Sequence, residues 1–154
     1  MSDKIQVRKA VADDWEVIAR FNRAMAMETE KKELPLPIIT AGVQAVFRNP
    51  GYGFYAVAEI DKNIVGCLMV TPEWSDWRNG VFWWIQSVYV QPELRKQGVY
   101  RALYEFVKNA AQENPEVCGF RLYVEKENLR AQKTYRALGM EETAYRLYEE
   151  TLLK

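Results

Sequence analysis

A basic run ending in glycine, Arg-Lys-Gln-Gly at 95–98, stands between a predicted strand and a predicted helix. The start of a helix presents free backbone N–H groups and the positive end of the helix dipole, which together bind phosphates. Gly98 permits a tight turn, and Arg95, Lys96 and Arg101 add positive charge. The glycine patterns of dinucleotide-binding folds and of P-loops are absent. By itself, the run is equally compatible with an ordinary turn that carries a solvated basic cluster.

A second pattern lies near the C-terminus, where Asn128, Ala131, Tyr135 and Gly139 follow one another at helical spacing. This spacing predicts a helix that begins at Asn128, with the Asn side chain as its N-cap, and ends near Gly139. Ala131 and Tyr135 share one face of that helix with Leu138. Tyr135 is then either a half-buried core aromatic or a hydroxyl group available for chemistry.

Together, with a predicted strand between them, the two patterns resemble the GNAT N-acetyltransferase superfamily. In that family a Q/R-x-x-G-x-G/A segment binds the pyrophosphate of acetyl-CoA, and residues 95–100 match it except at Tyr100, where Gly or Ala is usual. The family's Asn-x-x-Ala-x-x-x-Tyr-x-x-x-Gly-[Phe/Met] run matches at 128–140. The resemblance covers almost the whole chain. It implies an acyltransferase that uses acetyl-CoA (coenzyme A) as co-substrate and no metal.

Hydrophobic periodicity predicts alternating strands and helices. Strands are expected at about 4–9, 54–60, 64–74, 81–90, 119–125 and 141–149, and helices at about 13–29, 38–48, 99–112 and 128–138. The strands at 54–60 and 64–74 form a hairpin, and those at 81–90 and 119–125 run parallel across a helical crossover. The predicted fold class is α/β, a single domain over residues 1–154 with a mixed sheet and about four flanking helices. The resemblance adds that the parallel strand pair splays apart.

The resemblance also implies where the coenzyme lies. Acetyl-CoA would enter between the two parallel strands, whose opened edges would be 86–90 and 119–124, and the backbone of Val88 and Val90 would bond the pantetheine amides. The acceptor amine would attack the thioester directly in a ternary complex, without a covalent enzyme intermediate. The cofactor-binding residues implied are Val88, Tyr89, Val90, Arg95, Lys96, Gln97, Gly98, Val99, Tyr100, Arg101, Asn128 and Tyr135.

Two catalytic roles follow from the same resemblance. Tyr135 would stabilise or protonate the departing thiolate, because a phenol with a pKa of about 10 can donate to a thiolate whose thiol has a pKa of about 8.5. Some members place a Glu general base on the strand before the pyrophosphate loop. The matching residue here is Gln86, which can orient water but cannot be a base. The amine proton would leave through water or through a carboxylate such as Glu28, Glu30 or Glu73, each of which is also compatible with a solvated surface acid.

The acceptor site would be shaped by the first two helices and their linker, residues 25–37, and by nearby aromatic side chains. Five tryptophans occur in the chain, four of them within 74–84. Aromatic rings beside acidic groups suit a cationic amine, through cation–π and charge contacts. The candidate substrate residues are Glu28, Trp74, Trp77 and Trp84.

The composition limits the alternatives. Lys plus Arg and Asp plus Glu number 21 each, which argues against a protein built to neutralise nucleic-acid phosphates. The lack of His excludes Ser-His-Asp and Cys-His catalysis and His-containing zinc sites. Cys67 and Cys118 stand in apolar surroundings and are interpreted as core residues in a reducing, cytoplasmic compartment. The apolar runs are far shorter than the roughly 20 residues of a membrane span.

Three functions remain in competition. The first is an N-acetyltransferase for a small-molecule, polyamine, amino-acid or peptide amine. The second is a non-catalytic acyl-CoA-binding regulatory module on the same fold, and the third is a nucleotide-binding protein that uses residues 95–98 for phosphates. The presence of both Asn128 and Tyr135 favours the enzyme, because a binding module needs no acid for a leaving group. High apolar content and the aromatic strand at 81–90 also predict a homodimer.

Overall fold

A five-stranded sheet with the strand order β1-β2-β3-β4-β5 organises the computed structural model, which describes residues 4–153. The strands are β1 (Gln6–Lys9), β2 (Phe54–Ile60), β3 (Asn63–Ser75), β4 (Gly80–Val90) and β5 (Val117–Arg121). Neighbouring strands are antiparallel except β4 and β5, which are parallel as predicted. The helices are α1 (Trp15–Glu30), α2 (Leu36–Arg48), α3 (Val99–Gln112) and α4 (Leu129–Ala137). The sheet and the first three helices belong to one unit, Met1–Leu122, and α4 belongs to a second, Tyr123–Lys154.

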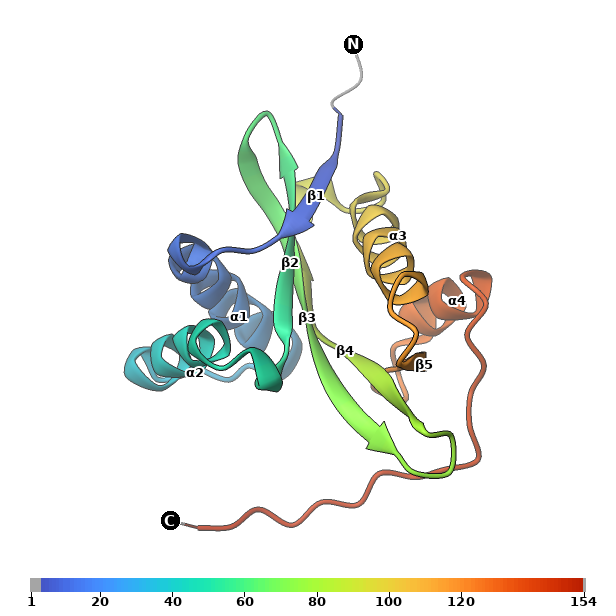
Figure 1. The fold of residues 1–154 in the computed structure, drawn as a ribbon. Helices are drawn as coiled ribbons and strands as arrows, with labels where there is room; N and C mark the ends of the chain where they lie inside the picture. The colour runs from blue at the N-terminus through green and yellow to red at the C-terminus, as the bar shows by residue number, and fades with distance from the viewer. Residues whose placement is uncertain (1–3, 154) are drawn as a thin grey trace. The chain divides into compact units, whose positions relative to one another are not determined.

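Helices cover both faces of the sheet in the first unit. The pair α1 and α2 packs on one face, and α3, which connects β4 to β5, packs on the other (Figure 1). Leu103 and Val107 of α3 are fully buried. Gly66 of β3 allows this close packing, since a Cβ there would lie 3.1 Å from Val99 Cγ1 and 3.0 Å from the Tyr89 carbonyl oxygen. The predicted α/β class with a mixed sheet is confirmed.

A bulge in β4 determines which of its side chains share a face. Cys67 pairs with Tyr89 and Met69 pairs with Gln86, so β4 has one residue more than β3 between these two pairs. Ser87, within this stretch, has a φ of 51°, in the left-handed region. Because a bulge adds one residue to the two-residue alternation of a strand, Gln86 and Tyr89 point to the same face. That face is the one covered by α1 and α2, since Tyr89 packs on Phe21 of α1 with 5.0 Å between ring centres.

The structure corrects several predicted boundaries. The strand expected at 119–125 is β5, which ends at Arg121, and no strand forms over 141–149, since residues 140–153 contain neither helix nor strand. An alternating pattern forms a strand only where a neighbour supplies hydrogen bonds, and the strand pairs among residues 4–153 involve β1–β5 alone. The second helix begins at Leu36 rather than 38, because Pro37 lies in its first turn, where proline is tolerated.

One of the two cysteines is not a core residue. Cys67 is buried among apolar side chains, and this burial raises the pKa of its thiol to about 12, so the thiol is protonated at neutral pH. Cys118 is exposed, which corrects the prediction. The physical reason is its place on β5, the last strand of the sheet, where fewer neighbouring side chains cover an apolar residue.

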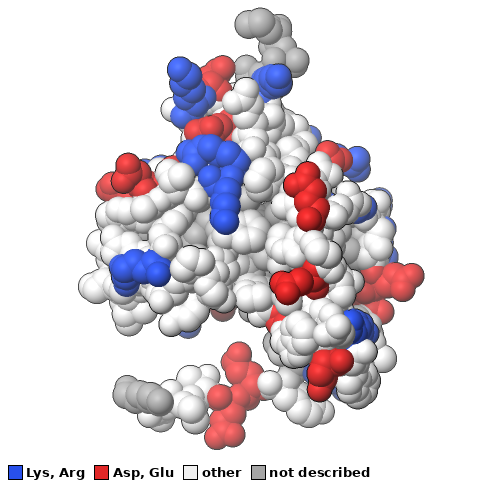
Figure 2. Space-filling view, viewed as in Figure 1, with Lys and Arg blue, Asp and Glu red and all other residues white. Residues whose placement is uncertain are grey.

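The outer surface of α1 and α2 is largely uncharged on the face shown in Figure 2, while Lys and Arg elsewhere on that face are interspersed with Asp and Glu. Among residues 4–153, no helix is both long and apolar enough to cross a membrane.

An ion pair between Arg8 and Asp14 joins β1 to the turn that precedes α1. Arg8 Nη1 lies 2.8 Å from Asp14 Oδ2, and Arg8 Nη2 lies 3.1 Å from Oδ1. The Val11 N–H also donates to Asp14 Oδ2, at 2.8 Å, and the Asp14 side chain is almost fully buried. The hydrogen bonds from Arg8 hold the pKa of Asp14 below its ordinary value.

We expect Asp14→Ala to lower the free energy of unfolding by about 2–3 kcal/mol at pH 7, because Arg8 and the Val11 N–H lose a buried charged partner. Since the folded-state pKa is lowered, this stabilisation is complete above the unfolded pKa of about 3.9 and is lost as the pH falls through the folded pKa. Urea melts of the wild type and the variant at pH 7 and pH 3 measure the difference. Asp13→Ala, an exposed acid of the same turn, is the control. An equal difference at both pH values would contradict the ion pair.

Candidate functional site

At its C-terminal end, β4 extends beyond its parallel neighbour β5. The paired register ends with Trp84 opposite Arg121, where β5 stops, whereas β4 continues to Val90. We call the end of this pairing the fork, and Ile85–Val90 the open β4 segment. The bulge at Ser87 lies inside this segment. Backbone groups along such a segment are available to an extended ligand, which binds as an added strand.

The fork lies further along β5 than predicted. Residues 119–121 pair with β4, so the opening expected over 119–124 does not include them. On β4 the opening covers 86–90 as expected. The reason is the earlier start of β5, at Val117, which the apolar sequence pattern did not reveal.

The open β4 segment leads through a short loop into the N-terminus of α3. Gly98 is the N-cap of α3 with a φ of 90°, which favours glycine, and Lys96 is also left-handed, with a φ of 66°. The Ala102 N–H donates to the Gly98 carbonyl at 3.0 Å, which closes the first turn of α3. The N–H groups of residues 99–101 belong to this first turn and precede Ala102 in the chain. A Cβ on Gly98 would meet no atom within 4 Å. The helix N-terminus therefore faces open space, as an anion site requires.

Arg95, one of the predicted phosphate ligands, is held by other parts of the first unit. Its terminal nitrogens lie 2.5 and 2.9 Å from the two carboxylate oxygens of Glu28 in α1, and its Nε donates to the Val90 carbonyl at 2.9 Å. The guanidinium also lies 5.5 Å from the centre of the Tyr89 ring. The Val90 carbonyl thus already accepts one hydrogen bond within the protein, at one of the two backbone positions predicted to bind the pantetheine.

Glu28 is poorly suited to the role of general base. The hydrogen bonds from Arg95 hold the pKa of the Glu28 carboxyl below its ordinary value. A carboxylate with a lowered pKa that is already bound on both oxygens is a weak acceptor for an ammonium proton. Glu28 instead connects α1 to the loop that precedes α3.

The remaining residues of the predicted phosphate segment are arranged around the start of α3. Among residues 4–153, Lys96 and Arg101 form no ion pair within 4.0 Å, and both are exposed. The Gln97 side chain donates to the Glu93 carbonyl at 3.1 Å, and Val99, the first residue of α3, is buried. The ring of Tyr100 lies beside that of Tyr104, with 6.2 Å between ring centres, so it extends along α3.

Polar side chains cross β3, β4 and β5 next to the fork, on the face that α1 and α2 partly cover. Gln86 Nε2 donates to the Thr71 hydroxyl. Trp84 Nε1 donates to Glu73 Oε1 at 2.9 Å, and Arg121 Nη1 donates to the same oxygen at 2.8 Å. We call these five residues the polar strip. Of the three candidate carboxylates, Glu73 is the one that lies in this strip with Gln86.

The tryptophans expected in the acceptor site lie apart from one another. Trp84 belongs to the polar strip. Trp74 follows Glu73 in β3 and therefore points to the opposite face of the sheet, where it is 59% exposed. Trp77 lies in the turn between β3 and β4 and is 87% exposed. Sequence reasoning missed Arg121, although its place in a short alternating run after an apolar helix was a usable signal.

In the second unit, Asn128 and Tyr135 lie on α4 as predicted. Asn128 Oδ1 accepts a hydrogen bond from the Ala131 N–H at 3.1 Å, which confirms the N-cap. Gly139 ends the helix with a φ of 98°, and the Met140 N–H donates to the Tyr135 carbonyl at 3.0 Å. The Tyr135 side chain is half-buried, and burial raises the pKa of its phenol, which is therefore protonated at neutral pH.

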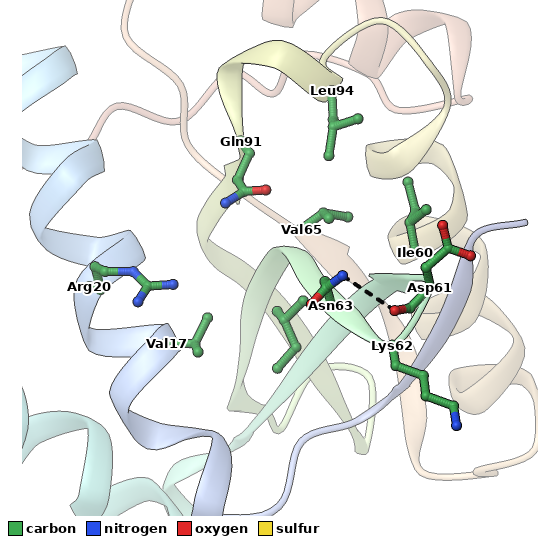
Figure 3. A pocket seen from close by; sticks show the side chains of 10 residues that line it. Val17, Arg20, Ile60, Asp61, Lys62, Asn63, Val65, Gln91 and Leu94 are labelled. Atoms are coloured by element: carbon green, nitrogen blue, oxygen red, sulfur yellow. Dashed lines mark hydrogen bonds between the residues drawn. The ribbon is translucent and has the colours of Figure 1, made fainter. Parts of the chain in front are cut away.

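A separate open pocket of about 660 Å³ lies between α1 and the β2–β3 turn. Figure 3 shows Arg20 extending toward it from α1, while Lys62 of the turn points away. Asn63 Nδ2 donates to the Asp61 carbonyl at 3.3 Å within that turn. None of the predicted site residues lines this pocket, so it is distinct from the fork. Among residues 4–153, no group of three or more His, Cys, Asp or Glu side chains is arranged to hold a metal ion.

Three solved structures resemble this chain over almost its whole length. A possible acetyltransferase from Clostridium difficile 630 is 44% identical, with a TM-score of 0.90 over 97% of this chain and 99% of that chain. An integron cassette protein from the mobile metagenome of Cole Harbour Salt Marsh is 21% identical, with a TM-score of 0.85 over 97% and 91% of the two chains. A predicted acetyltransferase from Clostridium acetobutylicum, crystallised with acetyl-CoA, is 18% identical, with a TM-score of 0.78 over 96% of each chain.

A comparison with curated proteins found no match. The model of the acetyltransferase (GNAT) family matches residues 11–140, which is most of the chain. This match, with the 44% identical structure, supports an acyltransferase activity. The chain therefore belongs to the GNAT family of acetyltransferases.

Proposed function

We propose that this protein is an N-acetyltransferase, that residues 1–154 act as one domain, and that it transfers the acetyl group of acetyl-CoA to an amine within a ternary complex. The observation that carries the proposal is the continuity of the open β4 segment with the N-terminus of α3. Coenzyme A has amides along its pantetheine arm and a pyrophosphate beyond them. An open strand edge followed by a helix N-terminus matches that order of groups.

Backbone groups and charged side chains of the site would bind different parts of coenzyme A. The Val88 backbone would bond the pantetheine, and the first-turn N–H groups of α3, with Lys96 and Arg101, would bind the pyrophosphate. Arg95 would act indirectly, by holding the loop to Glu28 and to the Val90 carbonyl. Arg95, predicted as a phosphate ligand, would thus position the loop instead of binding the phosphate itself.

The polar strip would take a proton from the acceptor ammonium, and Tyr135 would give one to the leaving thiolate. Glu73 would accept a proton from the acceptor ammonium, directly or through a water that Gln86 orients. The neutral amine forms a bond to the thioester carbonyl carbon, the carbon–sulfur bond breaks, and the new amide nitrogen releases its second proton to solvent, from which Tyr135 is reprotonated after it has acted. Tyr135, protonated at neutral pH, would donate to the departing thiolate.

The proposal is tested by ligand binding followed by turnover. We expect calorimetry to show at least tenfold tighter binding of acetyl-CoA than of ATP or NAD, and thiol release that depends on an added amine. Mass spectrometry of the amine products identifies the acetylated compound. Binding of acetyl-CoA without acetylation of any amine in a broad panel would point instead to a regulatory module. Tighter binding of ATP or NAD would point to a nucleotide-binding protein.

We also propose that the protein acts in the cytoplasm as a homodimer. In the second unit, Leu147, Tyr148 and Leu153 are 67%, 89% and 96% exposed, which is unusual for large apolar side chains so close together. A self-complementary contact through such residues would remove them from water. We expect sedimentation equilibrium at micromolar concentration to give the mass of a dimer, and Tyr148→Glu to shift it toward the monomer. A monomer mass for the wild type would contradict the proposal.

A further inference from the structure

We propose that the polar strip is the acceptor site and that the acceptor is an α-amino acid with a free carboxylate. The inference rests on the proposed N-acetyltransferase function and adds the class of amine. It is carried by the contacts among Glu73, Trp84 and Arg121, all within the first unit.

The polar strip lies next to the fork, where the reacting bond is expected. Trp84 and Arg121 form the last pair of β4 and β5, and Gln86 follows on the same face of β4. A thioester at the end of a pantetheine arm held along the open β4 segment would lie at the fork. The polar strip therefore places a carboxylate, a guanidinium and an amide next to the fork on this face.

Glu73 lies at the centre of the polar strip, between Trp84 and Arg121. The described contacts of Glu73 both use Oε1, which accepts from Trp84 Nε1 and from Arg121 Nη1. The Arg121 guanidinium also lies 3.7 Å from the centre of the Phe82 ring, which orients its plane. The two side chains remain partly accessible, at 26% for Arg121 and 42% for Glu73. A partly exposed ion pair of this kind contributes little to stability, and both of its side chains remain partly accessible to a ligand at the fork.

The adjacent charges of Glu73 and Arg121 match those of an α-amino acid. Because the carboxylate and the guanidinium are in direct contact, the two complementary charges of a ligand must also be adjacent. An α-amino acid carries its ammonium and its carboxylate on one carbon. Its ammonium would face Glu73, which can take up the proton, and its carboxylate would face the planar guanidinium of Arg121. A polyamine has no anion for Arg121, and a cation placed beside that guanidinium is repelled.

This acceptor class differs from the one that the sequence alone predicts. Acids such as Glu28 beside aromatic rings predict a cationic amine. In the structure Glu28 is neutralised by Arg95, and Glu73 has Arg121 as its partner. Trp74, one of those rings, points to the other face of the sheet.

The experiment compares matched acceptors on the intact protein. Each standard amino acid is assayed beside its α-carboxamide and its decarboxylated amine, by thiol release and mass spectrometry. We expect at least one free acid to exceed its own amide at least tenfold in kcat/KM. We expect Arg121→Met to remove this preference by lowering kcat/KM for the acid at least tenfold more than kcat/KM for the amide. Arg78→Met is the matched control, since Arg78 also lies against Phe82, at 4.9 Å, outside the strip.

The outcomes separate the proposals. If amides or decarboxylated amines are acetylated as well as the acids by the wild type, the amino-acid acceptor is wrong and the N-acetyltransferase stands. Equal losses for acid and amide in Arg121→Met, with a lower melting temperature, would assign Arg121 a structural role and overturn its part in recognition. The wild-type comparison decides the acceptor class even if the variant does not fold. If the panel gives no acetylated product, the inference and the catalytic function fail together.

Discussion

Replacing Tyr135 with Phe is expected to lower kcat and kcat/KM together by about 10²–10⁴-fold, the usual contribution of a general acid. The substitution removes one oxygen and keeps the ring. The hydroxyl assists only as the carbon–sulfur bond breaks, because the intact thioester has no negative charge on sulfur. The affinity for acetyl-CoA should therefore change little. Steady-state kinetics with a good acceptor and calorimetry with acetyl-CoA measure the two effects.

Tyr145→Phe provides the matched control, because Tyr145 lies in the same unit and is 75% exposed. We expect that control to retain wild-type turnover. Full turnover in Tyr135→Phe would show that water or the amine protonates the thiolate. A lower melting temperature with turnover reduced only in proportion would show that the hydroxyl serves a structural hydrogen bond, worth about 1–3 kcal/mol.

The second large effect is expected at Gly98. Gly98→Asp places a carboxylate at the N-terminus of α3, where we place the pyrophosphate. Two like charges about 4 Å apart near a protein surface repel by about 4 kcal/mol, so the Kd for acetyl-CoA should rise at least about 100-fold. No neighbouring atom opposes the change, since a Cβ meets none within 4 Å, and an acid at a helix N-terminus is favourable, but the φ of 90° strains any side chain at this position.

Gly98→Asn separates charge from size and backbone strain. Its side chain has nearly the same shape as Asp, it tolerates a positive φ, and it is neutral. We expect its Kd to rise less than about tenfold. The wild-type Kd should also rise with ionic strength, because Lys96 and Arg101 are exposed cations whose attraction is screened by salt. An unchanged Kd in a folded Gly98→Asp protein would exclude this helix N-terminus as the phosphate site.

The elements that sequence analysis located well are those determined by neighbours in the chain. The stripe of Val99, Leu103 and Val107 predicts α3 because residues three and four apart share a helix face. The turn after Ile60 predicts the β2–β3 hairpin, and Asp61 and Lys62 both take the left-handed conformation that such a turn needs. Asn128 caps α4 through an atom only three residues away.

Patterns of the same kind failed where a distant partner decides the outcome. Alternation over 141–149 predicts a strand, but a strand exists only with a hydrogen-bonded neighbour, and the apolar pattern does not specify one. Cys118 has apolar neighbours in the sequence, yet it lies on the last strand of the sheet and is exposed. Local composition indicates which secondary structure a segment favours, whereas the burial of that segment depends on which elements pack against it.

The sequence alone therefore determined the order of elements as far as α4, the glycine and basic residues before α3, and the capped helix that bears Tyr135. The tertiary structure decided the rest of the candidate site. The bulge at Ser87 is a matter of register between β3 and β4, and the ion pairs of Glu28 with Arg95 and of Glu73 with Arg121 join residues 67 and 48 positions apart. Such contacts form only when separate elements pack, because no local preference of either residue selects its distant partner.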